Sequence, residues 1–127
     1  MCNATYLEVL YLSNNSFSGT IPRCLIERNA REWNDTLRTP DLSDNRLERE
    51  VPESLDNCTM LEVLNLGNTL ISGTFPYWLM NSTNIRVLVL RSNKFHGPIG
   101  CPAIKPAWPM LQIVDLASNN FSGKLLP

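Results

Sequence analysis

Apolar residues recur along this chain in a short pattern that is repeated about every two dozen positions. The segment LEVLYLSNNSFSGTIP, which begins at Leu7, aligns without a gap with LEVLNLGNTLISGTFP, which begins at Leu61. Similar blocks begin at Leu37, Ile85 and Leu111, so that consecutive blocks start 30, 24, 24 and 26 residues apart. Five such units account for nearly all of the 127 residues, and they predict an array of repeated structural units.

Leucine alternates with other residues in the triplets 10–12, 64–66 and 88–90, and a period of two predicts short strands with one buried face. Such strands are stable only when they stack in parallel, about 4.8 Å apart, and satisfy each other's backbone groups. An asparagine follows at a fixed offset, where its amide can bond the backbone of its own unit and of the neighbouring unit. We therefore expect a ladder of buried, structural asparagines, formed by Asn15, Asn45, Asn93 and Asn119.

Three positions depart from the repeat. Pro40 stands at a core leucine position inside a strand, where the N–H of proline is missing. Arg49 stands where the other units have a turn glycine, and Thr69 stands where the ladder asparagine belongs. We expect the substitutions at Arg49 and Thr69 to cost on the order of 1 kcal/mol each, through backbone strain or an unmet backbone hydrogen bond.

The second half of each unit is a more specific motif, present here as FSGTIP, ISGTFP and FSGKL. It resembles the plant extracellular class of leucine-rich repeats, which occurs in receptor kinases, receptor-like proteins and polygalacturonase inhibitors. The stretches NCTMLEVLNLGN, RVLVLRSNKFHGPI and LQIVDLASNNFSGKL are most similar to ectodomain repeats of receptor-like proteins of the Verticillium-wilt-resistance and Cladosporium-resistance type. The resemblance covers about residues 7–127.

This resemblance implies an α/β solenoid, in which leucine-rich repeats form a right-handed superhelix. A parallel β-sheet would line the concave face, and 3₁₀ or short helices and loops would form the convex side. We expect one array over residues 1–127, with about five repeats that start near 7, 37, 61, 85 and 111 and without N- or C-terminal caps. The resemblance also implies secretion, glycosylation, and immune recognition of a microbial ligand with the help of a co-receptor kinase.

Strand side chains that alternate with the core leucines point away from the core, toward the concave face. They form a mixed surface, which Arg38, Asp44, Glu62 and Arg86 flank. A rigid array with tyrosine and arginine suits a peptide or protein partner better than a small metabolite. The residues that we expect to bind the ligand are Tyr11, Asp41, Asn65, Val89, Arg91 and Asp115.

Composition excludes several function classes. Eleven basic and twelve acidic residues give a net charge of −1, so neither a nucleic acid nor an anionic membrane surface is an expected partner. The single histidine, His96, lies in a repeat turn, and the acidic residues are spread over different strands without an evident catalytic pair. The four cysteines include no CxxC pair. We therefore expect no enzyme activity, no metal site and no cofactor.

Six N-x-[S/T] sequons indicate an extracellular parent protein. Two of them, at Asn14 and Asn120, lie beside ladder asparagines, where chance in an asparagine-rich chain explains the match. The others lie outside the ladder, and two of these precede a strand on the convex side. We expect glycosylation at Asn57, Asn81, Asn3 and Asn34.

The sequence thus predicts a non-catalytic recognition module from the ectodomain of a plant cell-surface immune receptor, with a co-receptor kinase ectodomain as a second partner. The parent protein would lie at the extracellular face of the plasma membrane. This chain itself shows no signal peptide and no apolar run of the roughly 20 residues that a bilayer span needs. Two alternatives stay open. One is a polygalacturonase-inhibitor-like protein, which requires a cluster of concave charges, and the other is a truncated gene product without autonomous function.

Overall fold

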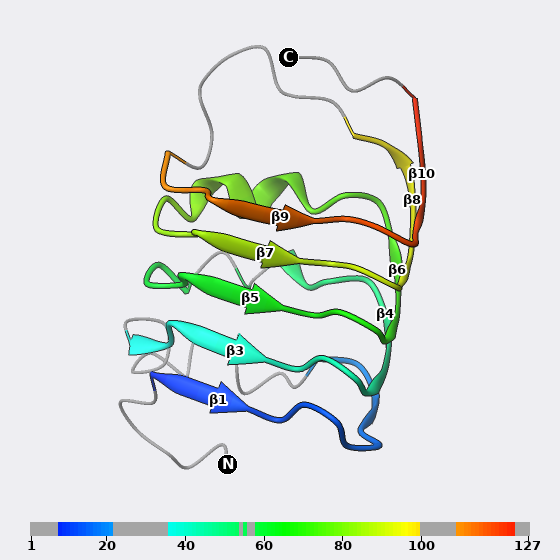
Figure 1. Ribbon diagram of the computed structural model, residues 1–127, viewed down its shortest axis with the longest axis horizontal. Coiled ribbons are helices and arrows are strands. Elements are labelled where there is room, and N and C mark those ends of the chain that lie inside the picture. Colours follow the sequence, from blue (N-terminus) through cyan, green and yellow to red (C-terminus); the bar gives the residue numbers. More distant parts are fainter. Residues whose placement is uncertain (1–7, 22–35, 54, 56–57, 100–108, 124–127) are drawn as a thin grey trace.

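The computed structural model describes residues 8–21, 36–53, 55, 58–99 and 109–123. In this part, five stacked coils each contribute one strand to each of two parallel sheets (Figure 1). The parallel-strand solenoid expected from the repeat is confirmed. The strands of the first sheet follow one another along the chain and are β1 (Val9–Tyr11), β3 (Thr39–Asp41), β5 (Val63–Asn65), β7 (Val87–Val89) and β9 (Ile113–Asp115).

The register of the first sheet reproduces the intervals of the sequence repeat. Val9 pairs with Thr39, and Val63 pairs with Val87, which pairs in turn with Ile113. A slip of one residue would turn every leucine of a strand from the core to the solvent. The hydrophobic pattern therefore fixes the pairing of each coil with the next.

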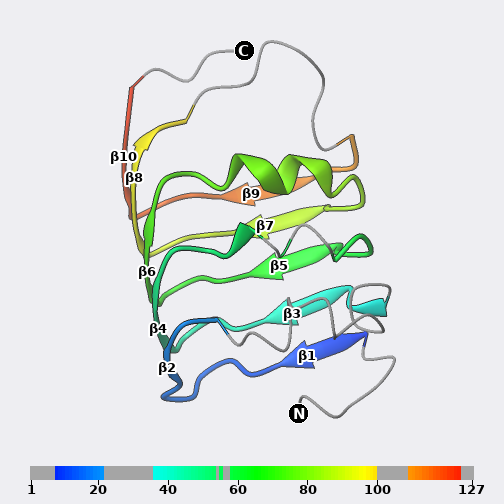
Figure 2. The same ribbon diagram turned by 180° about the vertical axis from the view of Figure 1, so that it is seen from behind.

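The second sheet was not predicted from the sequence. Its strands run in the order β10-β8-β6-β4-β2, along the edge where the chain turns away from the first sheet (Figures 1 and 2). They are β2 (Ser18–Gly19), β4 (Arg46–Arg49), β6 (Leu70–Gly73), β8 (Lys94–Pro98) and β10 (Asn120–Ser122). The motif segments that end in the turn glycine are thus strands themselves.

Neighbouring strands of the second sheet are displaced by two residues relative to the repeat. Ser72 pairs with Lys94 and Gly73 with Phe95, an offset of 22 residues, whereas the corresponding first-sheet strands pair at an offset of 24. A displacement by an even number of residues keeps each side chain on its own face of the sheet. The displacement also brings the turn residue of one coil close to the residue that follows the turn in the preceding coil, as for Gly73 and Glu50.

The turn that ends each second-sheet strand requires a left-handed backbone. Gly73 has a φ of +103° and Gly97 a φ of +84°. In the second coil, Arg49 takes this position with a φ of +67°, although such a conformation costs a residue with a side chain about 1–2 kcal/mol. Glycine is required at position 73 for a second reason, which is close packing: a Cβ atom there would lie 2.7 Å from Cγ of Glu50.

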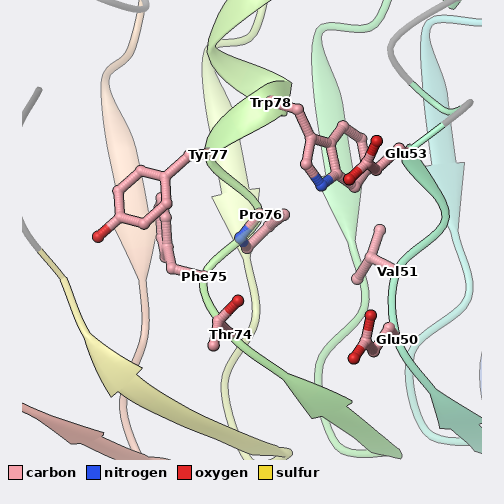
Figure 3. Close-up of a pocket in the computed structure, with 8 residues that line it drawn as sticks. All are labelled: Glu50, Val51, Glu53, Thr74, Phe75, Pro76, Tyr77 and Trp78. Carbon is pink, nitrogen blue, oxygen red and sulfur yellow. The ribbon is translucent and has the colours of Figure 1, made fainter.

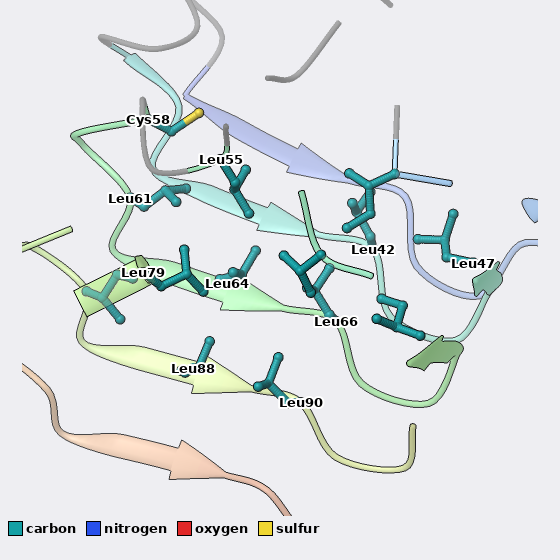
Figure 4. Close-up of a cluster of buried hydrophobic side chains, with 14 of the residues drawn as sticks. Leu42, Leu47, Leu55, Cys58, Leu61, Leu64, Leu66, Leu79, Leu88 and Leu90 are labelled. Carbon is teal, nitrogen blue, oxygen red and sulfur yellow. The ribbon is translucent and has the colours of Figure 1, made fainter. Parts of the chain in front are cut away.

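A continuous hydrophobic core fills the space behind the first sheet (Figure 4). Leucines from consecutive coils stack on one another, as the period of two predicts. The ring of Phe95 is fully buried and stacks on that of Phe121, with 5.9 Å between the ring centroids. The leucines with at most 1% of their surface exposed are Leu37, Leu61, Leu64, Leu66, Leu79, Leu88 and Leu90.

Helix content in the described residues is small. The 3₁₀ helix η3 (Tyr77–Asn81) follows Pro76 and lies behind the first sheet, on the expected convex side (Figures 1 and 2). After Pro52 the chain makes a turn in which the N–H of Leu55 donates to the carbonyl of Pro52. The described part is therefore closer to a pure β-solenoid than the α/β class suggests.

Pro40 occupies the middle of β3 and is buried, as the leucine of other coils would be. The N–H of Leu42 donates to the carbonyl of Asn65 in the next coil. N–H groups two residues apart point in the same direction, so a residue other than proline at position 40 would also donate toward β5. The pairing of β3 with β5 is accordingly reduced to Asp41 with Asn65, while β5 and β7 pair at three positions.

The chain leaves each first-sheet strand through a residue in the left-handed region, directly before the ladder position. Asparagine, aspartate and serine fill this position, and asparagine and aspartate are the side-chain-bearing residues that tolerate the conformation best. The turn directs the following side chain inward. The left-handed residues are Asn14, Asp44, Asn68, Ser92 and Ser118, with φ between 54° and 57°.

The ladder asparagines join neighbouring coils through both ends of the amide. Nδ2 of Asn93 donates to the carbonyl of Leu66 in the preceding coil at 2.7 Å and to Leu90 in its own coil at 3.1 Å. Its Oδ1 accepts from the backbone N–H of Ile71, again in the preceding coil, at 3.0 Å. Asn45 and Asn119 make the corresponding bonds with their preceding coils.

The first and third coils differ from this arrangement. Asn15 is exposed and, among the described residues, bonds the carbonyls of Leu12 and Ser13 in its own coil. Thr69 is buried, and its hydroxyl donates forward to Oδ1 of Asn93 at 2.6 Å. Threonine has no amide with which to bond both a donor and an acceptor of the second coil. The link between the second and third coils therefore lacks the bonds that a ladder amide makes to the backbone of the preceding coil.

Asn93→Ala should lower the free energy of unfolding by about 3 kcal/mol, because it leaves one backbone N–H and several carbonyls without their partner at the edge of the core. Urea denaturation followed by circular dichroism measures this change. Asn15→Ala is the matched control and should cost less than about 1 kcal/mol, because water can reach the same carbonyls in the first coil. Equal losses in the two variants would contradict a structural role for the bonds between coils.

Arg49→Gly should raise the free energy of unfolding by about 1 kcal/mol, because it removes the strain of a side chain at positive φ. Arg46→Gly, in the same strand and also exposed, should lower it by a similar amount, because an extended backbone gains nothing from glycine. Opposite signs in chemical denaturation are the expected result. Destabilisation by both substitutions would show that Arg49 is not strained.

Candidate binding surface

The outward side chains of the first sheet form one continuous surface, which we call the first-sheet face. Five of the six predicted ligand residues occupy a single row, in which each residue pairs with the next across neighbouring strands. Strands lie about 4.8 Å apart, so this row spans about 19 Å. Arg91 lies two residues further along its chain. The row consists of Tyr11, Asp41, Asn65, Val89 and Asp115.

Exposure differs along this row. Tyr11, at one end, is 71% exposed, whereas Asp41, Asn65 and Val89 are half-buried. At the other end Arg91 is exposed, and its Nη1 lies 3.3 Å from Oδ2 of the half-buried Asp115. An aromatic side chain therefore marks one end of the row and an ion pair marks the other.

Polar members of the row are held by turns that the sequence analysis did not anticipate. Oδ1 of Asp41 accepts from the backbone N–H of Ser43 at 3.0 Å and from its hydroxyl at 2.6 Å. In the next coil, Oδ1 of Asn65 accepts from the N–H of Gly67 at 3.0 Å. These contacts fix each side chain as it leaves its strand, while Oδ2 of Asp41 and Nδ2 of Asn65 are the atoms left to meet a ligand.

A second row runs across the neighbouring strands where each strand begins. It contains Val9, Thr39, Val63, Val87 and Ile113, which are the first residues of their strands. The two end members are 48% and 56% exposed, so the first-sheet face has an apolar row beside its polar one.

A row of alternating charges borders the apolar row. Nε of Arg38 lies 3.3 Å from Oε1 of Glu8, and Nη1 of Arg38 lies 3.0 Å from Oε2 of Glu62. Arg86 extends the row, with its Nε 3.8 Å from Oε1 of Glu62. The hydrogen bond that Arg38 donates to Glu62, together with the charges of both glutamates, raises the pKa of Arg38 further above its ordinary value.

These charged residues were expected only to flank the ligand surface. The structure pairs three of them, Arg38, Glu62 and Arg86, with one another, and it places Asp44 elsewhere, where its Oδ1 accepts from Nδ2 of Asn68 at 2.7 Å. The signal was present in the sequence, because glutamate and arginine alternate at the second position of consecutive repeats. A charge held between two opposite charges is less available to a ligand than Arg91, which has one partner among the described residues.

Predicted glycosylation sites fall mostly outside the described residues. This holds for Asn3, Asn34 and Asn57, and for the side chain of Asn81, which ends η3. All four stay predictions.

The described residues hold no cluster of three metal-binding side chains. Among the helices of the described part, none has the length and apolar character needed to cross a bilayer.

Comparison with known proteins gives a consistent result. The Leucine Rich Repeat family matches residues 6–27 and 60–82. Receptor-like protein 54 of Arabidopsis thaliana is 41% identical over 98% of this chain, and Receptor-like protein 35 of the same plant is 38% identical over 98%. The chain covers only 18% and 15% of these two relatives.

Solved structures show the same fold. The Arabidopsis receptor kinase HAESA, in complex with the peptide hormone IDA and the co-receptor SERK1, matches with a TM-score of 0.76 and 30% identity, over 92% of this chain and 18% of that chain. The repeat, the two sheets and the similarity over almost the whole sequence agree. The chain belongs to the leucine-rich-repeat proteins and, among them, to the receptor-like proteins of plants.

Proposed function

We propose that this chain is part of a non-catalytic recognition surface and binds an extended peptide or protein segment along the first-sheet face. The observation that supports this most directly is the row from Tyr11 to Asp115, in which side chains of five strands are aligned in register. A row of about 19 Å matches about six residues of an extended peptide.

The chemistry of the row also favours a peptide. Tyr11 offers a large exposed ring and Arg91 an exposed guanidinium, and these residue types dominate the energy of many protein interfaces. Asp41 and Asn65 are already held by their turns, so a ligand would lose little of its binding energy in ordering them. The neighbouring apolar row would cover the other side of such a peptide.

Similarity to receptor ectodomains supports the same class of partner. The solved HAESA complex contains a peptide hormone and a co-receptor, and PEPR1, solved with AtPEP1, is 35% identical with a TM-score of 0.74. By this similarity, we propose a peptide or protein ligand and, as a second partner, the ectodomain of a co-receptor kinase. The parent protein would act at the extracellular face of the plasma membrane.

The inhibitor alternative has weaker support. It requires a cluster of charges on the concave face, but the charges there alternate in sign. Glu8, Arg38, Glu62 and Arg86 neutralise one another along the row, so the described surface has no field of one sign to attract an enzyme.

Selection of a random dodecapeptide phage library on the full chain tests this proposal. Peptides that bind should lose about tenfold or more in affinity for the Tyr11→Ala and Arg91→Ala variants, because each substitution removes an exposed hot-spot side chain. Biolayer interferometry with the synthesised peptides measures the dissociation constants. Circular dichroism of each variant verifies the fold.

Lys94→Ala and His96→Ala are the matched controls, because both residues are exposed on the second sheet. Their affinities should stay within about twofold of the original chain, since neither side chain belongs to the first-sheet face. Peptides whose binding depends on the second sheet, or the absence of any enriched peptide, would contradict the proposal.

A further inference from the structure

A separate recess lies where the chain leaves the second sheet, between the second and third coils (Figure 3). Its volume is about 220 Å³. One wall comes from the segment that follows β4 and includes Glu50 and Glu53, and the other comes from the segment that follows β6 and includes Thr74, Phe75 and Trp78. Two acids on one side and aromatic residues on the other therefore line the recess, which we call the acidic pocket, and Trp78 is the ring that lies beside the acids (Figure 3).

Neither acid of this pocket belongs to an ion pair among the described residues. The ion pairs of the described part join Arg38, Arg86 and Arg91 to Glu8, Glu62 and Asp115, which lie on or beside the first-sheet face. Glu50 and Glu53 are exposed at the mouth of the pocket. Both carboxylates are thus without an ion-pair partner within the part of the chain that the structure describes.

Glu50 is held in place by its neighbours. Its stem lies across Gly73, where a Cβ atom would come within 2.7 Å of Cγ and 3.3 Å of Cδ of Glu50. The residue before it, Arg49, has a φ of +67°, a conformation that costs energy and that fixes the direction in which the chain enters the pocket wall.

The second coil differs from its neighbours at this point. The first and third coils have glycine followed by threonine, Gly19 with Thr20 and Gly73 with Thr74, where the second coil has Arg49 and Glu50. Leucine periodicity requires neither change. The acidic wall is a local property of this coil rather than a property of the repeat.

The aromatic residues of the pocket are also held in place by contacts with their neighbours. Phe75 is 4% exposed and meets the ring of Tyr77 edge to face, with 4.9 Å between centroids. Tyr77 in turn donates its hydroxyl to the carbonyl of Pro98 in the next coil at 3.0 Å. This anchors the start of η3, from which the half-buried Trp78 reaches the pocket.

We propose that the acidic pocket binds an arginine side chain of a protein partner. Two carboxylates attract a cation and exclude an anion, and an apolar group would leave them without solvent or partner. Arginine fits better than lysine because its planar guanidinium can donate two parallel hydrogen bonds to a carboxylate while its face lies on an aromatic ring. This contact does not depend on the ligand of the first-sheet face.

Titration of the full chain with Nα-acetyl-arginine methylamide tests the proposal. The indole N–H signal of Trp78, assigned in ¹H–¹⁵N spectra by its loss in Trp78→Phe, should shift in a saturable way. The matching citrulline compound has nearly the same shape without the charge and should cause no shift. The lysine compound should cause a weaker shift at equal concentration.

Glu50→Thr combined with Glu53→Gln should reduce the arginine-induced shift about fivefold or more, because it removes both partners of the guanidinium. Threonine at position 50 is the residue of the neighbouring coils, so this variant should fold as the original chain does, and its spectrum verifies this. Glu48→Gln is the matched control, since Glu48 is exposed in β4 and outside the pocket. It should leave the titration unchanged.

Three results would each overturn the proposal: an equal shift with citrulline, an unchanged titration in the double variant, or no shift with arginine. Equal shifts with lysine and arginine would overturn the choice of arginine. The variants leave Tyr11 and Arg91 intact, so these results are independent of the peptide-selection test on the first-sheet face.

Discussion

The fold depends on one constraint, which is that backbone groups of each coil need hydrogen-bond partners where the chain turns out of the first sheet. In the inner coils, carbonyls at this turn lie at the edge of the core, and a side-chain amide donates to them. The amide of Asn93 meets the requirement because it donates to Leu66 and accepts from Ile71 in the preceding coil at once. Stacking of leucines stabilises the array, but these amides fix the coils to one another.

Sequence reasoning predicted the first sheet and its core well, because both follow from side-chain periodicity. Leu64 and Leu88 are buried and paired where the repeat places them. The second sheet could not be predicted in the same way. Its strands depend on backbone bonds between coils and on a two-residue displacement, which no single repeat displays. The charged row of Arg38 and Glu62 was visible as an alternation but was not interpreted as pairing.

The two candidate sites also differ in how far the sequence alone could predict them. Tyr11 and Asp41 could be assigned to one face because outward residues alternate with leucines. The acidic pocket could not be found from the sequence, because it arises where Glu50 of one coil lies across Gly73 of the next. Contacts of this kind depend on the displacement of the second sheet, so a surface built between coils becomes visible only in three dimensions.

Departures from the repeat gather around the second coil, and the architecture explains why they are tolerated. Pro40 removes one hydrogen bond from the ladder, and Arg49 holds an unfavourable backbone conformation, yet both lie in a coil that pairs with a neighbour on each side. In a solenoid the stability of one unit is shared with its neighbours, so a weak coil can persist between stronger ones. A coil that need not be optimal for stability is free to differ in its surface chemistry. Glu50 follows directly after the strained Arg49, so the strained residue lies next to one of the two acids that line the acidic pocket.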